Sequence, residues 1–107
     1  MDAQLFKALS DGTRLRIVEL LSGREYCVRA LSLKLGLSES AVSQHMKVLR
    51  DVNLVEGVSY GYYTHYRLRR EPFEALSLAL RELATPPSVR KDCDAKEQVG
   101  CRTAKQA

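Results

Sequence analysis

Apolar residues recur along the first half of the chain at the spacing of short amphipathic helices. The pattern predicts four helices, at about residues 5–9, 14–21, 27–35 and 39–52. Residues that cap or end helices separate them: Ser10-Asp11-Gly12, Thr13 as N-cap of the second helix, Ser22-Gly23, Gly36, and Ser38 as N-cap of the fourth. A chain that opens with four short helices is expected to be mainly α.

A β-hairpin is predicted to follow the fourth helix. Residues 54–59 and 62–68 are rich in Val, Tyr and Thr, which strands favour, and Tyr60-Gly61 between them suits a tight turn. Pro72 suits the first turn of a last helix. The apolar face of that helix carries Phe73, Leu76, Leu80 and Leu83.

The composition of the chain changes near residue 85. Every Leu, Ile, Phe and Tyr lies within residues 1–84, whereas residues 85–107 contain none of them and begin Thr85-Pro86-Pro87-Ser88. A segment so poor in apolar residues cannot bury enough surface to order itself. We therefore expect a folded domain over residues 1–84 and a flexible tail over residues 85–107, in which Cys93 and Cys101 lie.

Charge and cysteine content narrow the class of protein. Lys and Arg number 17 against 13 Asp and Glu, a net charge of +4 that is compatible with a nucleic-acid partner. No apolar stretch is long enough to span a membrane and no signal-peptide core follows Met1, so we expect a cytoplasmic chain without a membrane partner. Three cysteines, an odd number, favour free thiols in a reducing compartment.

The stretch Ala30–Leu49 has the pattern of a helix-turn-helix. Two short helices are joined by Leu35-Gly36-Leu37-Ser38, the length and glycine placement typical of this motif. In the second helix, Val42, Met46 and Leu49 share an inward face. The outward face is polar and suited to base edges and phosphates in the major groove: Ser40, Ser43, Gln44, Lys47 and Arg50. A solvated helix face would accept the same residues, but the hairpin that follows favours a winged helix-turn-helix.

Two segments resemble the ArsR/SmtB family of metal- and metalloid-responsive repressors. Ala8–Ile17 (Ala-Leu-Ser-Asp-Gly-Thr-Arg-Leu-Arg-Ile) is similar to the start of the family domain, and Leu37–Glu56 is similar to its recognition helix and the entry to its wing. The resemblance spans about residues 3–84 and implies a homodimer that binds a palindromic operator in double-stranded DNA until an inducer lowers its affinity. The dimer would pair through the first and last helices, whose apolar residues are Leu5, Phe6, Leu9, Phe73, Leu76, Leu80 and Leu83.

The tip of the predicted wing departs from the family pattern. The family commonly has Arg or Lys near this tip, whereas this chain has Val58-Ser59-Tyr60-Gly61-Tyr62-Tyr63. Hydroxyl groups can donate to phosphates, so Tyr60 and Tyr62 are candidate DNA contacts. The alternative is that these tyrosines only cover a small sheet, while Tyr66 and Leu68 pack on the domain.

The resemblance also places a candidate inducer site. Arsenic-responsive members carry Glu-Leu-Cys-Val-Cys-Asp-Leu at the start of the third helix, where this chain has Glu25-Tyr26-Cys27-Val28-Arg29-Ala30-Leu31. Cys27 matches the first cysteine and Arg29 replaces the second, so further thiolates would have to come from Cys93 and Cys101. Cys93 lies nine positions after Ala84, a reach of roughly 30 Å when the chain is extended. Three sulfurs suit As(III) or Sb(III).

Other interpretations are compatible with the same residues. Cys27 can instead be a small core residue with the tail cysteines as bystanders, or the thiols can sense oxidants or persulfide by forming disulfides. A winged-helix adaptor for another protein is a third possibility. An enzyme is not expected, because the chain lacks paired carboxylates, a phosphate-cradling glycine loop and a Cys–His–Asp arrangement. No zinc ligand set and no organic cofactor are expected.

Overall fold

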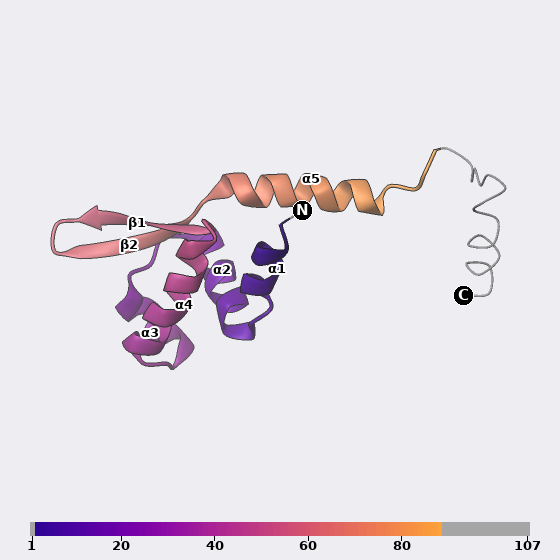
Figure 1. The fold of residues 1–107 in the computed structure, drawn as a ribbon. Helices are drawn as coiled ribbons and strands as arrows, with labels where there is room; N and C mark the ends of the chain where they lie inside the picture. Colours follow the sequence, from indigo (N-terminus) through magenta and orange to yellow (C-terminus); the bar gives the residue numbers. More distant parts are fainter. Residues whose placement is uncertain (1, 89–107) are drawn as a thin grey trace.

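The computed structural model describes residues 2–88. The elements are α1 (Ala3–Leu9), α2 (Gly12–Gly23), α3 (Val28–Leu35), α4 (Glu39–Asp51), β1 (Val55–Tyr60), β2 (Tyr63–Leu68) and α5 (Arg70–Ala84). Helices α1 to α4 pack together, the β1–β2 hairpin projects from one side of them, and α5 extends past α1 in the other direction (Figure 1). The mainly α fold with one small hairpin is therefore confirmed. Within residues 2–88, every helix is too short or too polar to cross a membrane.

The core lies where α2, α3 and α4 meet the base of the hairpin. The predicted inward face of α4 is confirmed, because Val42, Met46 and Leu49 are all buried. They pack with residues from every neighbouring element, including Ile17, Leu21, Leu31, Leu54, Val55 and Leu68. Burying one face of α4 in this way leaves its opposite face toward solvent.

Capping side chains set where α2 and α4 begin. The prediction that Thr13 caps α2 is wrong: Asp11 is the N-cap, and its Oδ1 accepts the backbone N–H of Arg14 at 3.0 Å. Thr13 lies two residues later, as the second residue of the helix, where its backbone is already helical. Ser38 caps α4 as predicted, since its Oγ accepts the N–H of Ala41 at 3.1 Å.

A residue with a left-handed backbone conformation lies just after each of the helices α3 and α4. Gly36, with φ of +68°, stops α3 and turns the chain toward α4. After α4, Asn53 has φ of +61°, a conformation that Asn tolerates better than most side chains. The Asn53 N–H donates to Arg50 O and the Leu54 N–H to Leu49 O, which is the pairing of a Schellman motif.

The hairpin turn differs from the predicted one by one residue. Tyr60 pairs with Tyr63 at the end of the antiparallel ladder, so Gly61-Tyr62 forms the turn rather than Tyr60-Gly61. Gly61 has φ of +71° and Tyr62 does not have a positive φ, the pattern of a type II′ turn. The first position of a type II′ turn favours glycine, so the turn begins at Gly61 and Tyr60 remains in β1.

The connection between α2 and α3 joins the sheet at one point. Tyr26 and Tyr66 form an antiparallel bridge, with N–O distances of 3.2 and 2.8 Å. Cys27 follows Tyr26 directly and is the N-cap of α3. The start of α3 and the wing are thus tied to each other through backbone hydrogen bonds.

Candidate nucleic-acid interface and inducer site

Helix α4 presents the predicted polar row to solvent. Ser40, Ser43, Gln44, Lys47 and Arg50 are all exposed, on the side of α4 away from its buried apolar residues. Their hydroxyl, amide and cationic groups can donate to base edges and phosphates, and an α-helix fits the major groove. The structure therefore brings the helical candidates together on one accessible face.

Two of these side chains make contacts within the chain. Lys47 Nζ lies 3.3 Å from Asp51 Oδ2, but the two side chains are 70% and 65% exposed, so the pair is weak and leaves Lys47 available. The guanidinium carbon of Arg50 lies 5.8 Å from the centre of the Tyr66 ring on β2. Arg50 therefore links the end of α4 to the wing, a contact that sequence reasoning missed.

Arg14 connects α1, α2 and α4. Its Nε donates to Ala8 O at 2.6 Å and its Nη1 lies 3.4 Å from His45 Nδ1 on α4. The hydrogen bond from the Arg14 N–H lowers the pKa of Asp11, and the Arg14 guanidinium lowers it further. Arg14 therefore links α4 to the first two helices through His45. The sequence pattern predicts no role for Arg14 beyond the family resemblance of its segment.

The wing tyrosines have different surroundings. Tyr62, in the turn, is fully exposed. Tyr60 is also exposed, but its hydroxyl donates to Glu25 Oε1 at 3.0 Å, and this bond raises the pKa of Tyr60. Tyr66 packs against the core and Leu68 is buried, as predicted. Of the two candidate DNA contacts in the wing, only Tyr60 thus has its hydroxyl held by a neighbouring carboxylate.

Cys27 is the thiol that the described residues supply to the candidate inducer site. It is half-buried, and its Sγ accepts the backbone N–H of Ala30 at 3.5 Å, so it caps α3. The other candidate ligands, Cys93 and Cys101, lie outside the described residues. Within residues 2–88, no three His, Cys, Asp or Glu side chains are grouped to hold a metal ion. A thiolate site at Cys27 therefore needs ligands from beyond residue 88.

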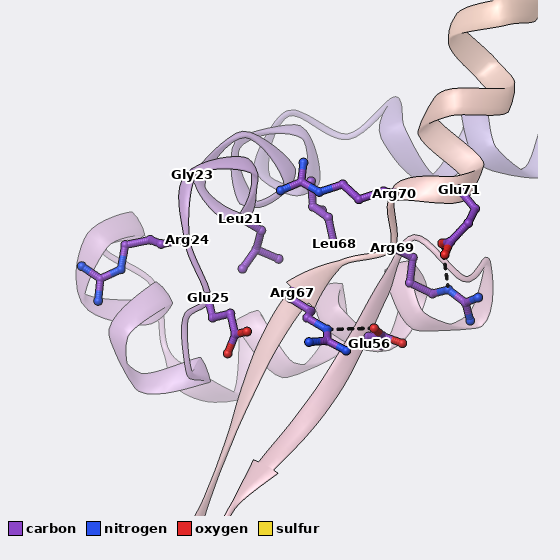
Figure 2. A pocket seen from close by; sticks show the side chains of 10 residues that line it. All are labelled: Leu21, Gly23, Arg24, Glu25, Glu56, Arg67, Leu68, Arg69, Arg70 and Glu71. Atoms are coloured by element: carbon purple, nitrogen blue, oxygen red, sulfur yellow. Dashed lines mark hydrogen bonds and ion pairs between the residues drawn. The ribbon is translucent and has the colours of Figure 1, made fainter.

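A cleft of about 380 Å³ lies between the end of α2, the base of the hairpin and the start of α5 (Figure 2). Leu21 and Leu68 lie among its lining residues, and charged side chains surround them. Most of these charges are paired: Arg67 with Glu56 at 2.8 Å and Arg69 with Glu71 at 3.9 Å. Arg70 reaches Ser22 O at 3.4 Å. This internal pairing gives the cleft little net charge with which to attract an ionic ligand.

The predicted dimer residues lie on α1 and α5. Leu5, Leu9 and Phe73 pack partly against the core, and Leu76 is half-buried. Phe6, Leu80 and Leu83 are exposed. Helix α5 has no buried residue, and Figure 1 shows it projecting beyond the helical body beside α1. A single copy of the described chain therefore leaves an apolar face uncovered along these helices.

Comparison with known proteins identifies the family. The model of the arsR family of bacterial regulatory proteins matches residues 11–57. The arsenical resistance operon repressor of Bacillus subtilis is 36% identical over 74 residues, which are 68% of this chain and 70% of that protein. This chain belongs to the ArsR family. The family and its fold are those of DNA-binding regulators, not of enzymes.

Two further comparisons agree with this assignment to the ArsR family. The arsenical resistance operon repressor of Escherichia coli is 46% identical over 66 residues, 61% of this chain and 56% of that protein. The chain spans about half the length of the first two curated relatives that it matches, 50% of one and 56% of the other. The homodimeric winged helix-turn-helix domain of Mb0332 from Mycobacterium bovis is 30% identical with a TM-score of 0.64, over 77% of this chain and 76% of that one. The winged helix-turn-helix fold is thus confirmed.

Proposed function

We propose that this ArsR-family chain is a transcriptional repressor that binds a palindromic DNA operator through α4. The observation that carries the proposal is the exposed polar row on α4, held in place by the fully buried face behind it. Ser43, Gln44 and Lys47 occupy the centre of that row and would face base edges. Ser40 and Arg50 would lie nearer the phosphates, and Tyr62 would extend the contact from the wing.

The repressor acts as a homodimer in this proposal. One α4 reads one half-site, and specific affinity requires two half-sites about one helical turn apart. The uncovered apolar residues of α1 and α5 supply a surface on which a second copy can pack. The homodimeric state of the similar Mycobacterium bovis domain supports this arrangement.

The proposed inducer is As(III) or Sb(III), bound by the thiolates of Cys27, Cys93 and Cys101. Support comes from the similarity to arsenical resistance repressors and from the position of Cys27 at the start of α3. Soft sulfur ligands favour such ions, and three of them can hold a trivalent ion against competing cellular thiols. The two tail cysteines can come from the same subunit as Cys27 or from its partner.

The role of Cys27 as a helix cap suggests how binding would lower DNA affinity. Bonding to the inducer would fix the direction of the sulfur and draw it toward the other thiolates, away from the position at which it accepts the Ala30 N–H. Leu31, one residue later, is fully buried in the core that also holds α4. A shift at the start of α3 is therefore passed to the recognition helix. Moving the population from 1:99 to 99:1 requires about 5.5 kcal/mol of differential affinity, which several metalloid–sulfur bonds can supply.

The test is a duplex-binding assay with and without arsenite in excess reductant, using a duplex selected by the wild-type protein. We expect salt-dependent binding that arsenite reverses. Cys27→Ser should bind DNA normally, because Ser is a good N-cap, but should resist release because it loses the soft ligand. Cys93→Ser combined with Cys101→Ser should behave in the same way.

Each part of the proposal can fail separately. Binding that does not distinguish the selected duplex from random DNA would contradict the repressor function and favour the adaptor. Release by arsenite from the variant lacking both tail cysteines would exclude the tail from the site. Release by an oxidant but not by arsenite would replace the metalloid inducer with thiol oxidation.

A further inference from the structure

A carboxylate beside the candidate inducer thiol contacts the wing. Glu25 lies on the connection between α2 and α3, and its side chain points toward the hairpin (Figure 2). Its Oε1 accepts the Tyr60 hydroxyl at 3.0 Å and lies 3.8 Å from Nδ1 of His65. One oxygen atom thus meets one side chain from each strand of the wing.

The wing side of this contact is a cluster of three rings. In the strand register Tyr60 lies opposite Tyr63, and His65 is two residues further along β2, so all three side chains share one face of the hairpin. The ring centres are 6.1 Å apart for Tyr60 and Tyr63, 5.2 Å for Tyr60 and His65, and 5.1 Å for Tyr63 and His65. Stacking orients the Tyr60 ring, which directs its hydroxyl at Glu25.

The position of Tyr60 makes this contact mechanically useful. The Tyr26–Tyr66 bridge attaches the middle of β2 to the α2–α3 connection, whereas Tyr60 is the last residue of β1 before the turn. The Tyr60–Glu25 hydrogen bond attaches the hairpin again near its tip, and this restricts rotation of the hairpin about the Tyr26–Tyr66 bridge. Tyr62, the exposed turn residue, is therefore held at a set position relative to α4.

We propose that Glu25 is a positioning residue for the wing, which acts through Tyr60 and His65 to set the orientation of the hairpin for DNA binding. It also passes any displacement of Cys27, two residues away, to the wing tip; this second role rests on the proposed inducer site. A displacement of the α2–α3 connection would then affect both proposed DNA-contacting elements. It would reach α4 through α3, which Cys27 caps, and the wing through Glu25.

A fluorescent reporter tests the positioning role in the free protein. The chain has no tryptophan, so Tyr62→Trp places a single one at the exposed turn. In this background Glu25→Ala and Tyr60→Phe should lower the tryptophan anisotropy. Glu25→Gln should largely preserve it, because an amide oxygen still accepts the Tyr60 hydroxyl. Tyr63→Phe is the matched control, since it keeps the ring and does not remove the hydroxyl that Glu25 accepts.

Two results would overturn this role. One is an anisotropy unchanged by Glu25→Ala and Tyr60→Phe in proteins whose circular dichroism confirms folding. The other is an equal fall for Tyr63→Phe, which would show that the loss of any hydroxyl in the ring cluster lowers the anisotropy and that the bond from Tyr60 to Glu25 has no special role. With native Tyr62, Glu25→Ala and Tyr60→Phe should weaken binding to the selected duplex by roughly threefold to tenfold, the range for one lost hydrogen bond.

A separate arm tests the coupling to the thiol. Arsenite in excess reductant should lower the tryptophan anisotropy of the Tyr62→Trp reporter protein. It should not lower the anisotropy of the reporter protein that also carries Glu25→Ala. The same fall in both proteins would show that Glu25 does not transmit the change. If arsenite fails to protect the thiols from a thiol reagent, the proposed inducer and the coupling are wrong. The anisotropies measured without arsenite still decide the positioning role.

Discussion

The guanidinium of Arg50 lies over the ring of Tyr66, with its central carbon 5.8 Å from the ring centre. Arg50 belongs to the last turn of α4 and Tyr66 to β2, so the contact joins the recognition helix to the wing. Glu25 holds the opposite face of the hairpin through Tyr60 and His65. The wing is thus fixed from both sides by side chains that arise from the helix-turn-helix and its entry.

A double-mutant cycle measures the Arg50–Tyr66 contact. We expect Arg50→Gln and Tyr66→Leu to show a coupling of about 0.5–1 kcal/mol in unfolding free energy, the range for an exposed cation–π pair. The salt dependence of DNA binding separates this role from the predicted phosphate contact. If Arg50 also reaches a phosphate, Arg50→Gln should reduce the salt slope, which is the slope of the logarithm of the binding constant against the logarithm of the salt concentration, by about one. An unchanged slope would limit Arg50 to supporting the wing.

Gln44 and Lys47 should differ in what they contribute to DNA binding. Gln44→Ala should cost about 1–3 kcal/mol on the selected duplex and little on random DNA, because its amide can pair with a base edge. Lys47→Ala should weaken binding to both duplexes alike and lower the salt slope, as expected for a phosphate contact. Titrations at several salt concentrations measure both effects. Equal losses on both duplexes for Gln44→Ala would mean that it reads no base.

Leu80 and Leu78 test the dimer surface on α5. Both are exposed, at 45% and 62%, but they point in directions about 200° apart on the helix. Leu80→Glu places a charge in the apolar face with Leu76 and Leu83 and should give a monomer. Leu78→Glu lies on the other side and should remain a dimer. Sedimentation at micromolar concentration distinguishes them, and a monomeric wild type would contradict the proposed assembly.

Asp11 should give α2 a stability that depends on pH. Its pKa lies below the ordinary value of 3.8, chiefly because its carboxylate accepts the Arg14 N–H. A lowered pKa in the folded state stabilises the protein above pH 3.8, and this contribution is lost as the pH falls toward the lower value. Asp11→Asn keeps an acceptor oxygen but does not titrate. Denaturant unfolding should therefore show the advantage of Asp11 over Asn at neutral pH and its loss in acid.

Local sequence information was sufficient for much of this fold. Helical periodicity determines which residues share a face, so the buried and exposed sides of α4 could be assigned from residue spacing alone. Gly36 and Ser38 act on the backbone of residues next to them in the sequence. The end of α3 and the start of α4 could therefore be predicted. The two predictions that were wrong, Thr13 as the N-cap and Tyr60-Gly61 as the turn, each missed the correct position by one or two residues. In each case backbone geometry, rather than composition, selects the position.

The side-chain contacts that join the elements could not be predicted in this way. Arg14 and His45 are 31 positions apart, and Glu25 and Tyr60 are 35 apart. No periodicity links such residues, because their distance depends on how the helices and the hairpin pack. The sequence by itself therefore determined the helices, the exposed polar face of α4 and the family of this chain. Only the tertiary structure decided which side chains hold the recognition helix and the wing in place, since those contacts exist only once separate elements are brought together.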